Sequence, residues 1–240
     1  MNFNFYMGQK KLVRFEAIKH FENVLEYPQD MQGKWNTFFK NEHPIVLELA
    51  CGKGEYAVGL GRMHPNKNFI GIDLKGNRIW RGAKTALEEG LNNVAFVRSH
   101  IDKINSYFKK DEVDEIWITF PDPQLKGARM KKRLTYSRFL RLYQSVLKTD
   151  GFVNLKTDSP DLYYFTKKVI EVFELNLVED FDNIYQQENI KPELKIKTHY
   201  EGLDIAGSNR IHYLRFQLNK ELPIEKDAIL KELFVNQESK

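Results

Sequence analysis

Asp122 is the residue of this sequence that points most strongly to chemistry, because it stands between Pro121 and Pro123 and shortly before a dense group of cations. Each proline fixes its own φ angle and favours an extended conformation in the preceding residue, so the Asp122 carboxylate should have a restricted direction. The cations follow with no acid among them: Lys126, Arg129, Lys131, Lys132 and Arg133. Such a group suits a polyanion such as a nucleic acid, although many basic runs are only solvated loops.

Length and composition describe an ordinary globular protein of 240 residues with a formal charge of +4. We expect one domain over 1–240, with an N-terminal extension at 1–40, a catalytic core at 41–220 and a C-terminal tail at 221–240. The single Cys51 can form neither an internal disulfide nor a cysteine metal site. Neither a signal peptide nor an apolar run of membrane-spanning length is present. We therefore expect a cytoplasmic protein with no metal ion and no membrane contact, as a monomer or a homodimer.

The elements that must position Asp122 follow from alternating short apolar runs and longer helical patterns, which is typical of βαβ units. We expect parallel strands at 45–49, 68–72, 94–97, 115–119 and 152–155. We expect helices at 55–63, 78–89, 101–107, 137–147 and 161–173, and a terminal antiparallel hairpin of strands at 175–179 and 210–218. Asp122 then lies just beyond the carboxyl end of a strand, where open α/β sheets bind ligands.

A glycine loop, Glu48-Leu-Ala-Cys-Gly-Lys-Gly54, follows the first of these strands, and Asp73 closes the second. Gly52, Gly54 and Ala57 match the dinucleotide-binding fingerprint, with Asp73 placed for the ribose hydroxyls. A pyrophosphate would meet the Glu48 carboxylate at a cost of about 1 to 4 kcal/mol. S-adenosylmethionine carries two cationic groups and no phosphate, so the loop favours it over a nicotinamide dinucleotide. A NAD-dependent dehydrogenase stays as an alternative, as does a loop that only makes a tight turn.

After the third strand, His100 and Ile101 lie where such folds bring the chain past an adenine. The His100 side chain, or backbone groups of either residue, could contact that base. An ordinary loop histidine is equally consistent with the pattern. No residues show metal-ligand spacing or suggest a nucleophilic triad.

Together the glycine loop, the Phe-Pro-Asp-Pro turn and the basic block resemble the bacterial tRNA (guanine-N7)-methyltransferases over most of residues 45–216. The cofactor loop Glu-x-Gly-x-Gly-x-Gly of that family looks like residues 48–54, with Ala50 in place of the first glycine. The family's Asn-Phe-Pro-Asp-Pro-Trp-Pro-Lys-Lys-Arg-His-His-Lys-Arg-Arg signature looks like residues 119–133. This chain departs from the family pattern at Thr119, Gln124, Leu125, Arg129 and Met130, and also at His100 and Leu203, where the family has Asp and Arg.

The resemblance implies an α/β fold, the Rossmann-like class I S-adenosylmethionine-dependent methyltransferase, with a seven-stranded, mostly parallel sheet that ends in an antiparallel hairpin. It implies methylation of guanine N7 in tRNA at the variable-loop guanosine, position 46. Asp122 would hold the guanine, and the basic block would hold phosphates. The implied cofactor residues are Glu48, Ala50, Gly52, Gly54, Asp73, His100 and Ile101, and the rest of the implied substrate pocket is Thr157, Asp158, Thr198, Tyr200 and Glu201. A non-catalytic RNA-binding module of the same fold is the remaining alternative.

Overall fold

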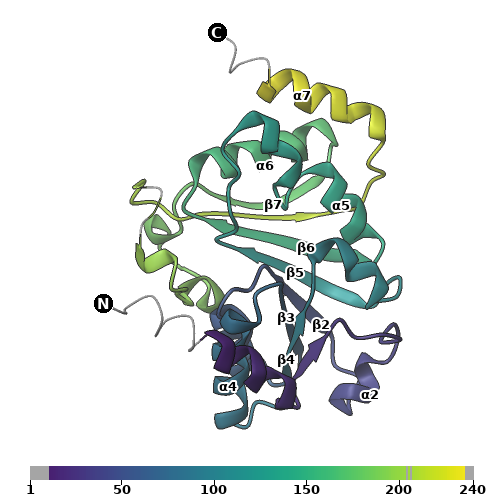
Figure 1. The fold of residues 1–240 in the computed structure, drawn as a ribbon. Helices are drawn as coiled ribbons and strands as arrows, with labels where there is room; N and C mark the ends of the chain where they lie inside the picture. The colour runs from purple at the N-terminus through teal and green to yellow at the C-terminus, as the bar shows by residue number, and fades with distance from the viewer. Residues whose placement is uncertain (1–10, 204, 206, 236–240) are drawn as a thin grey trace.

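The computed structural model describes residues 11–203, 205 and 207–235, and these residues form an α/β structure around one eight-stranded sheet (Figure 1). The strand order is β1-β4-β3-β2-β5-β6-β8-β7. The strands are β1 (Val24–Glu26), β2 (Ile45–Leu49), β3 (Asn68–Asp73), β4 (Val94–Arg98), β5 (Val113–Thr119), β6 (Leu147–Thr157), β7 (Asn176–Phe181) and β8 (His212–Gln217). Strands β1 to β6 pair in parallel, and β8 pairs antiparallel with both β6 and β7. The predicted mostly parallel sheet and its terminal hairpin are confirmed, and β1 is an additional edge strand.

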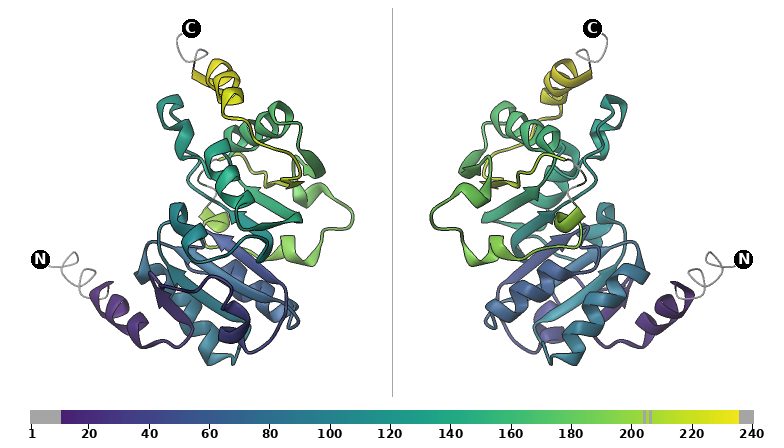
Figure 2. Two further views of the ribbon diagram at one scale, coloured as in Figure 1. Left: turned by 90° about the vertical axis from the view of Figure 1, so that its right-hand side faces the viewer. Right: turned by 90° about the vertical axis from the view of Figure 1, so that its left-hand side faces the viewer.

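Helices cover both faces of the sheet, as the two side views show (Figure 2). The α-helices are α2 (Trp35–Phe39), α3 (Glu55–Met63), α4 (Gly76–Glu88), α5 (Ser137–Gln144), α6 (Pro160–Val172) and α7 (Asp227–Val235), and residues 11–17 are also helical. The 3₁₀ turns are η1 (Ile18–His20), η2 (Ile101–Ser106), η3 (Gly127–Lys132), η4 (Ile184–Gln186), η5 (Pro192–Lys195), η6 (Glu201–Leu203) and η7 (Ile224–Lys226). The helix predicted at 137–147 is shorter than expected, because Leu147 already begins β6.

Alternate side chains of the central strand β5 enter two different hydrophobic cores. Ile116 and Ile118 pack into the cluster that also contains side chains of α5 and α6. Trp117 points the other way, into the cluster that contains side chains of α3 and α4. This alternation is the two-residue period of a strand that is covered on both faces. The parallel pairing of β1 to β6 then places the carboxyl ends of these strands along one edge of the sheet.

The two segments that the sequence suggested as peripheral both contribute to this core. Trp35, before the expected start of the catalytic core, is fully buried and stacks on Phe108 with ring centroids 5.1 Å apart. In the expected C-terminal tail, Leu230 is fully buried and Asp227 pairs with Arg141 at 2.7 Å. The folded unit therefore extends across both boundaries placed from the sequence, at residues 40 and 221.

Glu48 ties three elements together at the end of β2. Its side chain is buried, and Oε2 accepts a hydrogen bond from the backbone N–H of Ala57, the third residue of α3, at 2.8 Å. Its Oε1 accepts from the hydroxyl of Thr119 at the end of β5, at 2.9 Å. Burial raises the pKa of Glu48 to about 8, against the lowering effect of these two hydrogen bonds. The carboxyl group is therefore mostly protonated at neutral pH.

We predict that Glu48→Gln changes how stability depends on pH. Between about pH 5 and pH 8 the unfolded wild-type chain releases this proton while the folded chain keeps it, so the wild-type protein loses stability as the pH rises. The amide does not titrate, so the variant should gain about 1 to 3 kcal/mol relative to wild type over this range. Urea unfolding at several pH values measures the difference. The exposed control Glu42→Gln should show no such trend, and a constant offset for Glu48→Gln would mean that the folded carboxyl group is ionised throughout.

Candidate active site

A cavity of about 690 Å³ opens at the carboxyl ends of β2, β3, β5 and β6. This is the edge of an open α/β sheet at which ligands bind. Residues from five separate segments meet in its lining, and each was expected at the site from the sequence: Ala50, Asp73, Asp122, Asp158 and Tyr200. The cavity is therefore the candidate active site.

The glycine loop reaches this cavity through a run of left-handed backbone positions. The φ angles of Ala50, Gly52 and Gly54 are +56°, +56° and +71°. Glycine adopts this region freely, whereas a Cβ atom costs about 1 to 2 kcal/mol there, so Ala50 is a mildly strained replacement. Asp73 clamps the loop to the end of β3, because its Oδ2 accepts from the Gly52 N–H at 3.0 Å. The other oxygen accepts from the N–H of Lys75 at 2.8 Å.

Asp122 lies in a tight exposed turn between its two prolines. Its Oδ1 accepts from the N–H of Gln124 at 3.0 Å, and within the described part of the chain no hydrogen bond to Oδ2 is made. Phe120 and Gln124, on either side of the turn, both have positive φ angles, of +47° and +49°. Backbone strain of this kind persists only where the surrounding structure holds it in place. The turn therefore presents one carboxylate oxygen to the cavity in a defined position.

Arg133 is buried against the inner side of this turn. It does not lie on the exposed cationic surface, where we expected it. The side chain is 5% exposed, and its guanidinium lies over the Phe165 ring at 4.4 Å. Its Nε donates to the carbonyl oxygen of Pro123 at 3.0 Å, and its Nη2 reaches the carbonyls of Gln124 and Leu125 at 3.3 and 3.4 Å. The other four cations of the block are exposed, in or next to η3: Lys126, Arg129, Lys131 and Lys132.

Both threonines expected in the substrate pocket are buried and use their hydroxyl groups locally. Thr157 is 1% exposed and accepts from the N–H of Ser159 at 3.1 Å. Thr198 is 8% exposed and accepts from the N–H of Glu201 at 3.1 Å. They shape the turns that carry Asp158 and Tyr200, and their contact with a substrate stays a prediction.

Lys156, which the sequence did not single out, braces a segment that borders the site. Its fully buried ammonium group donates to the carbonyl oxygens of Leu194 and Ile196, both at 2.9 Å, and to Glu201 Oε2 at 2.8 Å. Tyr185 donates to the other oxygen of Glu201. Burial lowers the pKa of Lys156, and the charge of Glu201 opposes this shift. The ion pair anchors the segment that holds Tyr200 next to the glycine loop. The available signal was a single cation directly after the strand expected at 152–155.

His100 and Ile101 follow β4 but lie outside the lining of the cavity. The preceding residue, Ser99, donates its N–H to the carbonyl of Asp73 at 3.1 Å, so the segment runs beside the end of β3. An adenine contact from His100 or Ile101 stays a prediction. Glu48 is also outside the lining, because its carboxyl group is turned inward to α3 and β5.

The lining of the cavity is acidic. Four carboxylates face two cations: Asp73, Asp122, Asp158 and Asp161 against Lys75 and Arg78. This balance favours a cationic ligand over a pyrophosphate. The sequence had suggested that Glu48 would repel a pyrophosphate. Because the buried Glu48 carboxyl group is mostly uncharged, that repulsion comes instead from the four carboxylates of the lining. Among the described residues there is no cluster of His, Cys, Asp and Glu suited to a metal ion, and no helix long and apolar enough to cross a membrane.

Comparison with known proteins places the sequence in a family. A family model described as a putative methyltransferase matches residues 42–212. The tRNA (guanine-N(7)-)-methyltransferase of Christiangramia forsetii is 49% identical over 88% of this chain and 100% of its own length. The protein of the same name from Bacteroides thetaiotaomicron is 44% identical over 95% of this chain and 93% of its own length.

Solved structures agree with the predicted Rossmann-like methyltransferase fold at much lower identity. The 16S rRNA methyltransferase KamB has a TM-score of 0.58 at 12% identity, covering 81% of this chain and 98% of its own. The 30S ribosomal A1408 methyltransferase from an uncultured bacterium has a TM-score of 0.55 at 17% identity, covering 78% and 93%. These likenesses concern the fold, whereas the identity to the curated relatives reaches nearly half of the aligned residues. The chain belongs to the family of tRNA (guanine-N(7)-)-methyltransferases.

Proposed function

We propose that this protein transfers a methyl group from S-adenosylmethionine to N7 of a guanine in tRNA, and that the guanine is that of the variable-loop guanosine at position 46. The observation that carries this proposal is the single cavity in which Asp73 and the glycine loop face Asp122. Family membership supports the reaction and the substrate class. We place the reaction in the cytoplasm.

The acidic lining fits S-adenosylmethionine, which supplies an electrophilic methyl group on a sulfonium when it is bound. Asp73 would accept hydrogen bonds from the ribose hydroxyls with the lone pairs that the N–H groups of Gly52 and Lys75 leave over. A Cβ atom on Gly52 would lie in ordinary contact with the Tyr200 ring, at 3.5 Å, and would occupy the space between the loop and that ring. A dinucleotide would instead bring its pyrophosphate beside these carboxylates. The acidic cavity thus weighs against the dehydrogenase alternative.

Asp122 would position the guanine rather than act as a strong base. N7 of guanine carries a lone pair and is unprotonated at neutral pH, so the transfer needs no proton removed beforehand. The Asp122 carboxylate can accept from the N1–H and the exocyclic amine of the base, which fixes the plane of the ring. Orientation of this kind supplies up to about 7 to 11 kcal/mol in favourable systems. Arg133 contributes by holding the Pro123–Leu125 carbonyls.

The exposed cations of η3 would hold the RNA around the target nucleoside. Lys126, Arg129, Lys131 and Lys132 lie directly after the turn that carries Asp122. A guanosine in folded RNA has to be exposed or turned out of its stack to reach the cavity, so its flanking phosphates need ligands outside the cavity. These four side chains would supply them.

Incubation of the purified protein with total tRNA and S-adenosylmethionine tests the proposal. We expect 7-methylguanosine, mapped by mass spectrometry of digested tRNA to the variable loop, and S-adenosylhomocysteine binding by calorimetry with no response to NAD. Methylation of guanine N7 at another position would refute the variable-loop assignment. RNA binding without any methyl transfer would favour the non-catalytic module.

We predict that Asp122→Asn lowers the single-turnover methylation rate by roughly 30- to 1000-fold, which corresponds to about 2 to 4 kcal/mol of transition-state stabilisation. The amide keeps the shape of the side chain but offers one donor and one acceptor, so it cannot receive both guanine protons. S-adenosylhomocysteine affinity should barely change. The control Asp161→Asn removes the same charge from the cavity lining and should stay within about threefold of wild type. A near wild-type rate for Asp122→Asn with saturating tRNA would refute the assigned role.

We predict that the buried cation of the block affects kcat and stability, whereas the exposed cations affect the binding of tRNA. Arg133→Met leaves the turn carbonyls without their donor, so it should lower kcat at least about tenfold and the free energy of unfolding by about 1.5 to 3 kcal/mol. The slope of tRNA affinity against salt should not change. The control Lys131→Gln with Lys132→Gln should lower that slope by roughly 1.5 and leave kcat at saturating tRNA nearly unchanged. A reduced salt slope for Arg133→Met would place its guanidinium on the RNA.

A further inference from the structure

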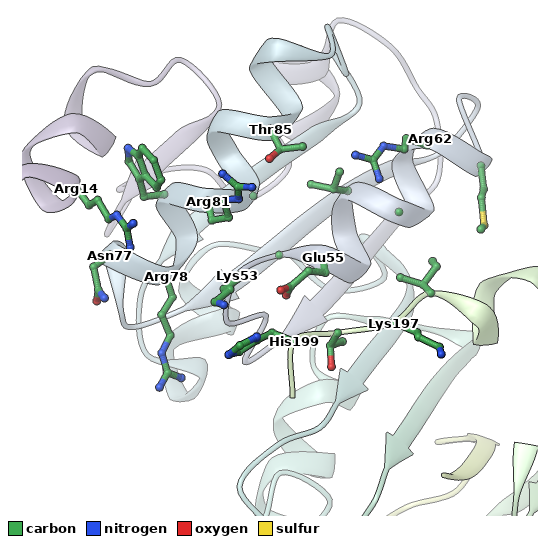
Figure 3. Close-up of a pocket in the computed structure, with 18 residues that line it drawn as sticks. Arg14, Lys53, Glu55, Arg62, Asn77, Arg78, Arg81, Thr85, Lys197 and His199 are labelled. Carbon is green, nitrogen blue, oxygen red and sulfur yellow. The ribbon is translucent and has the colours of Figure 1, made fainter. Parts of the chain in front are cut away.

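A second cavity, of about 1040 Å³, lies between α3, α4 and the segment 196–199 (Figure 3). Its lining is strongly basic, with Glu55 as its one acid in the described part of the chain. Six cations line it, and they come from four stretches that are distant in sequence: Arg14, Lys53 with Arg62, Arg78 with Arg81, and Lys197. We call this cavity the cationic groove.

Most of these charges have no acidic partner. Arg62 pairs with Glu89 at 2.5 Å, but no described residue forms an ion pair with Lys53, Arg78 or Arg81. Lys197 is exposed and lies 5.9 Å from the Tyr185 ring. Unpaired like charges that are gathered around one hollow repel one another and disfavour the compact state. Apart from Arg62, these cations form no ion pair with a described residue, so their concentration points to an anionic ligand.

Flat side chains are interleaved with the cations. The guanidinium of Arg14 lies over the partly buried Trp80 ring at 4.7 Å, and Trp80 also lines the groove. The ring of His199 lies 5.6 Å from that of Tyr200, edge to face. Figure 3 shows Lys53, Arg81 and His199 around the same opening. Cations that alternate with aromatic rings are the usual surface for a nucleic-acid strand, because phosphates and bases are both accommodated.

The groove adjoins the candidate active site. Arg78 lines both cavities, and its guanidinium lies 5.6 Å from the Tyr200 ring, which faces the active site. On another side of the active site, Leu125 forms part of the lining and leads directly into the exposed cations of η3. The active-site cavity itself is acidic and would repel phosphates. A polyanion that delivers a base into the active-site cavity would therefore be attracted by two separate surfaces, the cationic groove and the exposed cations of η3.

We propose that the cationic groove binds the phosphate backbone of the tRNA next to the methylated guanosine, as a second RNA-binding surface separate from the η3 cations. This inference rests on the proposed function, because it takes tRNA as the substrate. The groove draws its cations from the glycine loop, α3, α4 and the segment before Tyr200. RNA seated there would lie against the elements that also form the cofactor side of the active site.

The double variant Arg81→Glu with Lys197→Glu tests the groove. Both side chains are exposed, have no described ion-pair partner and lie outside the active-site lining. Fluorescence anisotropy with labelled tRNA should show binding weakened at least about tenfold, with the slope of log affinity against log salt reduced by roughly 1.5 or more. S-adenosylhomocysteine affinity, and kcat at saturating tRNA, should stay within about twofold of wild type.

The matched control is Lys34→Glu with Lys110→Glu, which changes the net charge equally at two exposed positions outside both cavities. Its tRNA affinity should stay within about twofold of wild type. Equal weakening in both double variants would overturn the proposal, because bulk charge would then be the cause. If the groove variant loses S-adenosylhomocysteine binding, Arg81→Ala with Lys197→Ala replaces it, with the same direction of effect expected.

The same experiments separate this inference from the proposed function. Unchanged tRNA affinity and salt slope in a groove variant, while the wild-type protein methylates guanine N7, would overturn the groove and leave the function in place. Absence of guanine-N7 methylation by the wild-type protein would refute the function. The binding comparison between groove and control variants would still decide whether the groove holds RNA, because it requires no catalysis.

Discussion

The architecture of the site depends on the buried contact between Glu48, α3 and β5. This side chain accepts from the first turn of α3 with one oxygen and from the Thr119 hydroxyl with the other, so it holds the glycine loop and the Asp122 turn at a fixed separation. Burial favours the protonated carboxyl group, which avoids leaving a charge inside the sheet. The glycine loop and the Asp122 turn are thus held by hydrogen bonds to the same side chain.

Two buried cations also join separate segments around the cavity through hydrogen bonds. Arg133 satisfies three carbonyls of the Asp122 turn, and Lys156 satisfies two carbonyls and Glu201 in the segment that carries Tyr200. Irregular backbone near a ligand site leaves carbonyl groups without strand or helix partners, and a buried cation supplies several donors from one side chain. Some basic residues of the protein are therefore internal braces, whereas we propose that others form a surface for RNA.

Charge is segregated by function around the site. The cavity that would receive the sulfonium cofactor and the guanine is lined by four carboxylates, whereas the cationic groove and the η3 cations lie outside it. By our proposal, this arrangement would draw an RNA strand to the rim while the acidic cavity excludes its phosphates, so that a nucleobase would enter more readily than the backbone. Arg78 and Tyr200 stand at the border between the two environments.

The sequence by itself determined the places of most strands along the chain, the bounds of α3 and the positions of Asp73 and Asp122 at strand ends, because period, glycine and proline patterns act on neighbouring residues. Only the tertiary structure decided which charged side chains are buried and which are exposed. Lys132 and Arg133 are adjacent, yet one is exposed and the other is buried beneath the turn. Whether a long cation is buried depends on carbonyls that other segments bring within reach, and the groove likewise joins residues as distant as Arg14 and Lys197. Such proximity follows from packing and not from spacing along the chain.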